Sequence, residues 1–195
     1  MEFCTDAAAS IGMGIYMDGK WAQARWGTNF PNETEGNNIT FLEYFPILVA
    51  LHIFEDKVKN KRVLFHCDNA SVVEIINKLT CKCPRVMDLV RPLVLQCMKI
   101  NTEIKAKHIP GIKDIIADSI SRFNTQVFRE HAPAAEKLAT EIPPFLWQLK
   151  TRKQKDWCNG HGLREHCKCS RWGKEALKLS ERQCNPHPKK ALLQH

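Results

Sequence analysis

The sequence predicts an α/β domain built on one mixed sheet, with helices packed against its faces. Strand-like and helix-like runs follow one another over residues 2–123 in the order β-β-β-α-β-α-α-β-α, which is typical of such a sheet. An Asp18-Gly19 pair between two apolar or aromatic runs indicates an antiparallel hairpin near the start. The chain has 195 residues, of which 44% are hydrophobic and 26% charged, so we expect one soluble domain with a core, plus an appendage.

The first part of the chain predicts three strands and a helix. The strands are expected at residues 2–6, 11–17 and 21–26, and a polar loop at residues 27–40. A helix follows at residues 41–56, with apolar side chains on or near one face. Pro46 lies inside it and should kink it, because proline removes one backbone hydrogen bond.

The second part predicts two strands and three helices. A short strand is expected at residues 63–65 and a half-buried one at 102–108, and helices at 70–79, 84–100 and 113–123. Pro84 suits the first turn of its helix, whereas Pro92 should kink it. A short further helix is predicted at Ala132–Ala139, before Pro143-Pro144.

The net charge of +8 is concentrated near the C-terminus. Residues 1–150 contain 18 Lys and Arg against 17 Asp and Glu, whereas residues 151–195 contain 11 against 4. A nearly neutral body with a basic tail points to nucleic acid only through that tail. We divide the chain into a domain at 1–125, an extension or linker at 126–149, and a tail at 150–195 that we expect to be disordered.

Cysteine usage indicates a reducing compartment. Five of the nine cysteines lie in the body, mostly in apolar settings: Cys4, Cys67, Cys81, Cys83 and Cys97. We interpret them as free thiols of an intracellular protein, in the cytoplasm or the nucleus, rather than as a secreted disulfide framework. The N-terminus MEFCTD lacks the features of a signal peptide, and no apolar run approaches the roughly 20 residues of a membrane span.

The tail is rich in residue types that bind zinc. It contains Cys158, His161, His166, Cys167, Cys169, Cys184 and His187. Their spacings do not form a familiar pair of zinc hooks. An ordered zinc site and a basic extension that binds nucleic acid non-specifically are alternatives, and the favoured interpretation is sequence without a selected fold, such as read-through.

Four acidic residues have recognisable local settings. Asp6 and Asp68 end apolar, strand-like runs, and Glu43 and Asp118 lie on helix-like segments. If the fold gathers these carboxylates, they supply the hard oxygen ligands that Mg²⁺ prefers. Two such ions about 4 Å apart can drive phosphodiester hydrolysis.

Each acid also has a structural interpretation. Asp6 could begin a turn, and the Asp68-Asn69 pair could cap the following helix. Thr40 and Glu43 fit the T-x-x-E capping box. Asp114 lies four residues before Asp118, on the same helical face, so chemistry alone leaves either residue as the fourth ligand.

Five segments in this order resemble the ribonuclease H domain of retroelement reverse transcriptases, of the DIRS-like and gypsy-like kinds. They are TDAAASIGMG, FLEYFPILVAL, VLFHCDNASVVEIINK, CPRVMDLVRPLVL and AKHIPGIKDIIADSISRF. The resemblance covers roughly residues 2–147. It implies a ribonuclease H-like fold, a five-stranded mixed sheet in the order 3-2-1-4-5 with helices on both faces.

The resemblance also implies roles for individual residues. Asp6, Glu43, Asp68 and Asp118 would hold two Mg²⁺ ions, for which Mn²⁺ can substitute, and hydrolyse the RNA strand of an RNA–DNA hybrid. Asn69 and His108 would contact the substrate, and a structural hydrogen bond is an equal alternative for His108. The AD-x-(I/L)-SR context favours Asp118 over Asp114, where the family more often has Asn. A reverse transcriptase domain outside these residues is the implied partner.

Some features favour other interpretations. Within these 195 residues only five precede Asp6 and none is expected to form a polymerase domain, and a body charge of +1 offers few phosphate contacts. Basic residues that could supply some are Lys57, Lys59, Lys61, Arg62, Lys105 and Lys107, although such runs are usually solvated faces. An inactive relic, a non-catalytic structural module and a nucleic-acid binder acting through the tail are the competing hypotheses.

Overall fold

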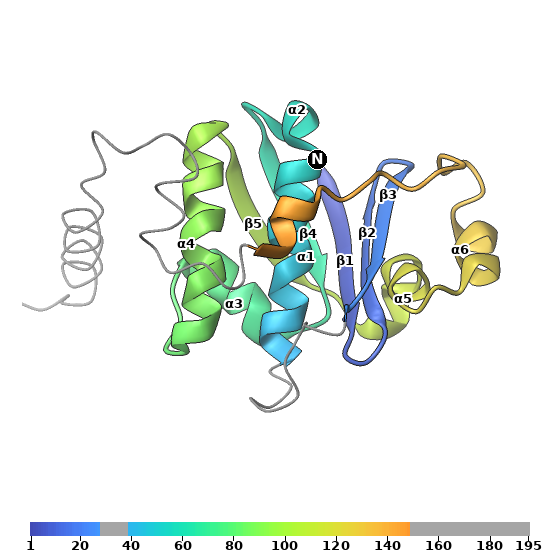
Figure 1. Cartoon of the computed structure of the whole chain (residues 1–195), viewed down its shortest axis with the longest axis horizontal. Coiled ribbons are helices and arrows are strands. Elements are labelled where there is room, and N and C mark those ends of the chain that lie inside the picture. Colours follow the sequence, from blue (N-terminus) through green and yellow to red (C-terminus); the bar gives the residue numbers. More distant parts are fainter. Residues whose placement is uncertain (28–38, 149–195) are drawn as a thin grey trace, which may run out of the picture. The chain divides into compact units, whose positions relative to one another are not determined.

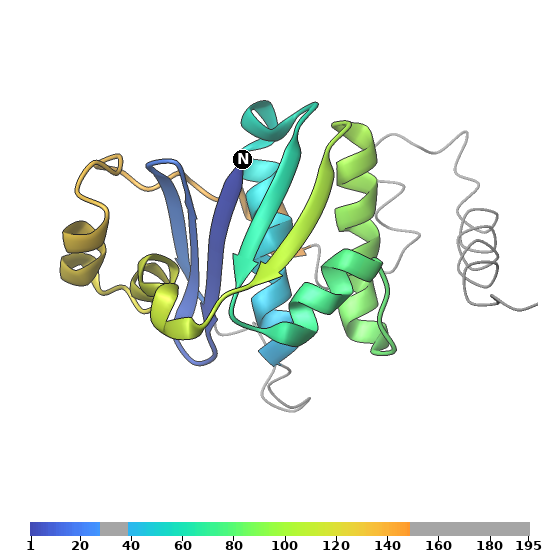
Figure 2. The same ribbon diagram turned by 180° about the vertical axis from the view of Figure 1, so that it is seen from behind.

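The computed structural model of this chain describes residues 1–27 and 39–148, which belong to one compact unit. They form a five-stranded mixed sheet with helices on both faces (Figures 1 and 2). The strands lie in the order β3-β2-β1-β4-β5, so the predicted five-stranded mixed sheet in the order 3-2-1-4-5 is confirmed. The polar loop predicted at 27–40 and the interpretations of the basic tail fall almost wholly outside the described residues.

The three N-terminal strands form an antiparallel meander. They are β1 (Glu2–Ala8), β2 (Gly12–Met17) and β3 (Lys20–Arg25). The predicted Asp18-Gly19 turn joins β2 to β3, and both of its residues have positive φ, at 48° and 79°. Two such residues are what the tight turn of a twisted hairpin requires.

The other two strands lie parallel to β1. They are β4 (Arg62–Cys67) and β5 (Glu103–His108), with β4 between β1 and β5. Phe3 of β1 is the register partner of Phe65 of β4, and their rings stack at a centroid distance of 5.1 Å. Because parallel neighbours end at the same edge of a sheet, the residues that follow β1, β4 and β5 come together there.

Six α-helices of the described residues pack around the sheet. They are α1 (Ile39–Ile53), α2 (Glu55–Val58), α3 (Ala70–Lys78), α4 (Pro84–Lys99), α5 (Ile115–Ser121) and α6 (Thr125–His131). Helix α1 packs between the sheet and α4, and every residue from Phe41 to Leu51 is buried. The sequence predicted one apolar face for this helix, whereas the structure buries all of its faces over this stretch. It continues past Pro46, as α4 does past Pro92, so neither proline ends its helix.

Helix α5 covers the other side of the sheet, against β1, β2 and β3. Its approach is close because β2 has glycine at the contact. A Cβ atom at Gly14 would lie 2.5 Å from the Ala117 carbonyl oxygen and 2.6 Å from the Ser121 nitrogen. Real Cβ atoms do not approach other atoms this closely, so the seat of α5 requires glycine at this position.

One predicted helix is absent from the structure, and one observed helix was not predicted. The helix predicted at Ala132–Ala139 is wrong, and α6, which Asn124 caps through a 3.3 Å bond from the Val127 N–H, was not predicted. Residues 136–140 instead run beside β3, with backbone bonds from Glu136 to Gly19 and from Thr140 to Trp21. Tertiary pairing therefore determines the conformation of this segment rather than local propensity.

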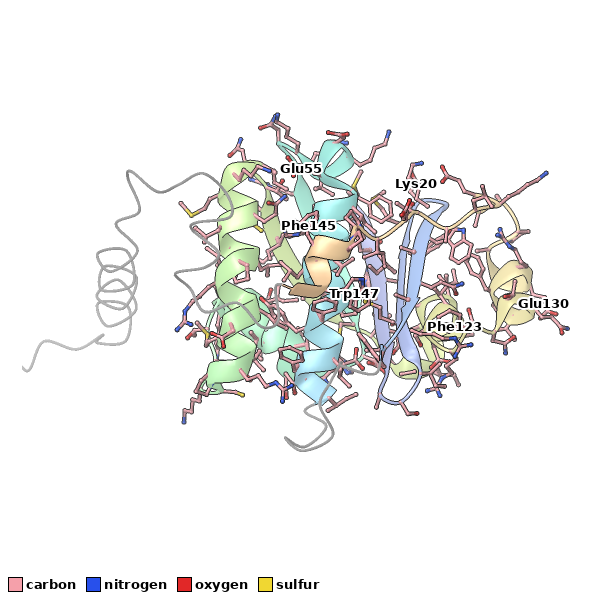
Figure 3. The ribbon with its side chains drawn as sticks, viewed as in Figure 1. Lys20, Glu55, Phe123, Glu130, Phe145 and Trp147 are labelled. Carbon is pink, nitrogen blue, oxygen red and sulfur yellow. The ribbon has the colours of Figure 1, made fainter. Side chains whose placement is uncertain are left out.

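The segment after residue 125 packs on the domain. The Arg129 guanidinium donates to the carbonyls of Ala135, Glu136 and Lys137. Further along, Leu146 is buried, and the Trp147 ring lies 5.6 Å from that of Phe45 in α1 (Figure 3). The boundary near residue 125 remains a prediction, but the described part of the extension is ordered against α1 and β3.

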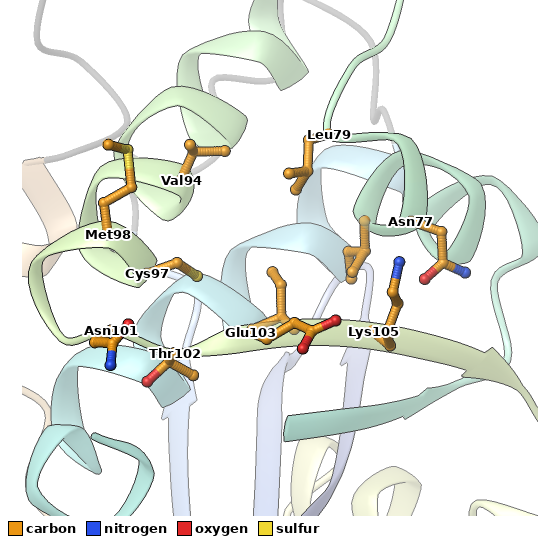
Figure 4. A pocket seen from close by; sticks show the side chains of 11 residues that line it. Asn77, Leu79, Val94, Cys97, Met98, Asn101, Thr102, Glu103 and Lys105 are labelled. Carbon is orange, nitrogen blue, oxygen red and sulfur yellow. The ribbon is translucent and has the colours of Figure 1, made fainter. Parts of the chain in front are cut away.

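The outer strand β5 is covered at one point by a side chain. The Asn77 amide of α3 donates to the Ala106 carbonyl at 2.9 Å and accepts from the Ala106 N–H at 3.0 Å. A groove of about 430 Å³ lies beside this contact, between α3, α4 and β5 (Figure 4). None of the predicted acids lines it.

The five cysteines of the described part are all free, in agreement with the prediction of free thiols in the body. Within residues 1–27 and 39–148, the search for membrane-spanning helices found no candidate of sufficient length and apolarity.

Candidate active site

The four predicted acids come from elements that meet at one end of the sheet. Asp6 lies near the end of β1, and Asp68 directly follows β4. Glu43 lies in the first turns of α1 and Asp118 in α5, and the ends of these elements gather at the lower edge of the sheet in Figure 1. Parallel pairing of β1 with β4 is what brings Asp6 and Asp68 to the same edge.

Three potential donors lie particularly close together. A carboxylate oxygen of Glu43, the Cys67 sulfur and a carboxylate oxygen of Asp68 are all within 4.8 Å of one another. Cys67 was not predicted as a site residue. Strand alternation could have indicated it, because Cys67 points to the face opposite His66, towards the core. Burial raises the pKa of its thiol, so Cys67 is a neutral neighbour of the two acids.

Asp6 is held by the helix on the other face. Its carboxylate accepts a hydrogen bond from the Ser121 hydroxyl of α5, and its register partner on β2 is Gly14. The pKa of Asp6 is raised, chiefly by burial and then by the charges of Asp118 and Asp68, while the Ser121 bond opposes the shift. The interpretation of Asp6 as a simple turn residue does not fit, because β1 continues to Ala8.

Glu43 is buried and incompletely hydrogen-bonded. Its Oε2 has no hydrogen-bond partner among the described residues. Burial first, and then Asp6, Asp68 and Asp114, raise its pKa to about 9, against a lowering contribution from the Ala7 backbone. The capping-box alternative is not formed, because Thr40 lies inside α1 rather than at its N-cap.

Asp114 and Asp118 have opposite environments. The Asp114 side chain is buried, and neither of its oxygens has a hydrogen-bond partner in the described part of the chain. Burial, followed by Asp6, Asp68 and Asp118, raises its pKa to about 8; the Ala117 N–H is close enough to lower the pKa but does not form a regular hydrogen bond. The Asp118 side chain is 44% exposed and pairs with Arg122 at 2.6 Å.

The two predicted substrate contacts have structural bonds next to the acids. The Asn69 Oδ1 accepts from the backbone of Ser71 and Val72 and caps α3. His108 at the end of β5 places Nε2 3.0 Å from the Asp68 carbonyl oxygen, so this ring nitrogen donates. Both side chains keep exposed surface beside Asp68, and their contact with substrate remains a prediction.

The donor set suits hard divalent cations. Five carboxylates lie close enough for their charges to interact, and among the described residues three of their oxygens are buried without hydrogen bonds: Glu43 Oε2 and both oxygens of Asp114. Buried polar atoms are normally paired, and carboxylate oxygens are the ligands that Mg²⁺ and Mn²⁺ prefer. The residues present therefore fit a divalent cation, and its charge would offset their mutual repulsion.

Three solved structures of ribonucleases H are similar to this chain. The enzyme RNase H1 from Halobacterium salinarum has a TM-score of 0.44 and 11% identity over 64% of this chain and 96% of its own. LC11 RNase H1 was solved in complex with an RNA/DNA hybrid. It has a TM-score of 0.44 and 20% identity, over 61% of this chain and 91% of its own. The N-terminal RNase H domain of a Mycobacterium tuberculosis protein has a TM-score of 0.42 and 14% identity, over 67% of this chain and 98% of its own.

No protein-family model matches the chain, and no curated protein matches it.

We expect the metal-free domain to lose stability as the pH rises. The folded-state pKa values of Glu43 and Asp114, about 9 and about 8, exceed their ordinary values of 4.5 and 3.8. The folded state therefore binds more protons between these limits, and the free energy of unfolding falls as pH increases through them. For each proton that the folded state retains and the unfolded state does not, the free energy of unfolding falls by about 1.4 kcal/mol per pH unit.

Urea denaturation in EDTA, over a pH series that spans these limits, would measure this loss. Added Mg²⁺ should reduce this loss of stability at high pH, because the ion binds the deprotonated carboxylates. A free energy of unfolding that increases with pH in EDTA would contradict the burial of these two acids.

Proposed function

We propose that this domain is a metal-dependent ribonuclease H that cleaves the RNA strand of RNA–DNA hybrids. One observation carries the proposal: carboxylates from β1, α1, the end of β4 and α5 converge, and buried oxygens of Glu43 and Asp114 have no hydrogen-bond partner. Such an arrangement is unfavourable without a cation, because it buries like charges together.

The residues proposed to hold the metal are Asp6, Glu43, Asp68 and Asp118. Two divalent ions, Mg²⁺ or Mn²⁺, would supply an activated water and stabilise the leaving oxygen when bound. The role of the chain is to position the ligands. Ser121 orients Asp6 through its hydroxyl, the His108 ring nitrogen holds the Asp68 backbone, and the Gly14 contact seats α5.

Substrate binding at this edge is proposed to involve Asn69, His108 and a lysine of β5. Lys107 is the register partner of His66, at the acid end of the sheet, and it is exposed. The other basic residues considered from sequence include Lys57 to Arg62, which lie at or before the start of β4, the opposite end from Asp68. The 2′-hydroxyl would distinguish the RNA strand from DNA.

We also propose that the domain derives from a retroelement reverse transcriptase polyprotein of the DIRS-like or gypsy-like kind, acting inside the cell. The support is the ordered set of five sequence segments, AKHIPGIKDIIADSISRF among them. A reverse transcriptase domain would then be its partner. Sequencing the genomic region around the coding segment tests this, since the absence of any polymerase-coding remnant would count against it.

The direct test of the activity is incubation of a labelled RNA–DNA hybrid with the protein and Mg²⁺ or Mn²⁺. We expect cleavage of the RNA strand only, and its loss in Asp68→Asn, which keeps the shape of the side chain and removes its charge. Circular dichroism should show that the variant is folded. The matched control is Asp88→Asn, because Asp88 is on α4 and pairs with Arg91 at the surface.

The outcomes separate the competing functions. No cleavage by folded wild-type protein would overturn the nuclease proposal and favour an inactive relic or a structural module. Equal cleavage by Asp68→Asn would point to a contaminating nuclease. Hybrid binding that disappears on removal of residues 151–195, without cleavage, would favour a binder acting through the basic tail, whose residues carry 11 Lys and Arg against 4 Asp and Glu.

A further inference from the structure

Asp114 is the most enclosed carboxylate of the site, although the sequence context favoured Asp118. It lies between the short 3-10 helix η2 (Gly111–Lys113) and α5, and its side chain is 2% exposed. Neither of its oxygens accepts a hydrogen bond of regular geometry from the described residues. A buried carboxylate in this state is costly unless another group is bound to it.

Asp114 occupies a position where its carboxylate would normally accept backbone hydrogen bonds, yet it accepts none of regular geometry from the described residues. It is the N-cap residue of α5, where an aspartate normally accepts a bond from the backbone N–H groups of the first turn. Asn69 and Asn124 do so at the starts of α3 and α6, whereas Asp114 does not cap its helix. The Asp114 carboxylate thus does not form the regular capping bond of α5.

Two close contacts bring the backbone on either side of Asp114 next to the other acids. The turn before it lies against Asp68, since a Cβ atom at Gly111 would be 3.1 Å from Asp68 Oδ2. The Asp114 N–H bonds to the Gly111 carbonyl at 2.9 Å, which fixes the turn. On its other side, α5 is seated on β2 at Gly14, next to Asp6.

Charge compensation also differs between the two aspartates of α5. Asp118 has Arg122 as an ion-pair partner, at 2.6 Å. No Lys, Arg or His of the described part of the chain forms an ion pair with Asp114, and neither Asp6 nor Asp68 can compensate it. A bound proton or a divalent cation could do so, and of these the cation is a group that several carboxylates can share.

We propose that Asp114 is itself a ligand of the divalent cation, beside Asp6, Glu43, Asp68 and Asp118. This inference rests on the proposed metal-dependent function and adds a fifth carboxylate to it. Asp118, half exposed and held by Arg122, then lies at the margin of the site. Five carboxylates would bring more negative charge to the cation than four, which favours tighter binding of divalent ions.

The test uses Mn²⁺ alone as the probe, on the full chain without substrate. Free Mn²⁺ is followed by electron paramagnetic resonance, and the protons released per bound ion by calorimetry in two buffers of different ionisation enthalpy. The variants are Asp114→Asn and Asp118→Asn, with Asp88→Asn as the surface control. Asp114→Ala is a second variant, because an asparagine oxygen could still contact the ion.

We expect Asp114→Asn to weaken Mn²⁺ binding by about tenfold or more, a typical loss for a residue of a metal site, and to release fewer protons per ion. Asp118→Asn should weaken binding less, Asp114→Ala at least as much as Asp114→Asn, and Asp88→Asn should match the wild type. Wild-type affinity and proton release in both folded Asp114 variants would overturn the inference.

The two proposals fail separately. A protein that binds Mn²⁺ through Asp114 but leaves the hybrid intact would retain this inference and lose the nuclease function. A protein that cleaves the hybrid while Asp114→Asn keeps wild-type affinity for Mn²⁺ would lose only this inference. Absence of Mn²⁺ binding by the wild type would overturn both.

Discussion

Replacement of Glu43 by glutamine is expected to stabilise the metal-free domain and to abolish its metal binding. Burial and three neighbouring aspartates raise the pKa of Glu43 to about 9, so at neutral pH the folded protein carries a proton that the unfolded chain does not. Glutamine has almost the same shape and needs no proton. The gain in the free energy of unfolding should be on the order of 2 kcal/mol at neutral pH.

The stability gain of Glu43→Gln should increase with pH. A raised folded-state pKa means that the cost of Glu43 is absent below its ordinary pKa of 4.5 and grows until pH reaches about 9. The advantage of Glu43→Gln should therefore be small in mild acid and largest in mild alkali. Urea denaturation in EDTA over that range measures it, and Mn²⁺ titration measures the loss of binding.

The matched control is Glu74→Gln. Glu74 is an exposed glutamate of α3 that pairs with Lys78, so its replacement should leave the free energy of unfolding nearly unchanged and leave Mn²⁺ binding intact. If Glu43→Gln destabilises the metal-free protein at every pH, or binds Mn²⁺ like the wild type, Glu43 is not the buried ligand that we describe.

Replacement of Gly14 by alanine is expected to damage both the fold and the site. The new Cβ would lie 2.5 Å from the Ala117 carbonyl oxygen and 2.6 Å from the Ser121 nitrogen, and backbone atoms cannot move aside individually. Helix α5 must shift as a unit, at a cost of about 3 kcal/mol. The same shift would separate Asp114 and Asp118 from Asp6 and weaken metal binding.

Gly27→Ala is the control for this substitution. A Cβ atom at Gly27 would meet no other atom within 4 Å, so the change should be nearly neutral. Thermal and urea unfolding measure the stability difference, and Mn²⁺ affinity at a temperature where both variants are folded reports the site. Wild-type stability and affinity in Gly14→Ala would refute the close seat of α5 on β2.

Much of the fold was predictable because its signals are local. The Asp18-Gly19 turn, the apolar runs that end at Asp6 and Asp68, and the alternation in β5 depend on neighbours in sequence. The capping of α3 by Asn69 was likewise one of two open interpretations, and the structure shows it.

Other features could not be predicted because they depend on distant contacts. The conformation of residues 136–140 follows from backbone bonds to Gly19 and Trp21. The difference between Asp114 and Asp118 depends on the turn at Gly111, which lies against Asp68. Their spacing of four residues places both on one helical face and gives no indication of which is buried.

The outer strands of the sheet have a consequence for solubility. An exposed strand edge can pair with another chain and start aggregation. In this domain residues 136–140 occupy the outer side of β3 through two backbone bonds, and the Asn77 amide occupies both backbone groups of Ala106 on β5. Glu103, Lys105 and Lys107 add exposed charge along β5. The segment after residue 125 therefore covers the β3 edge against pairing with another chain, and a chain shortened at that point would expose this edge.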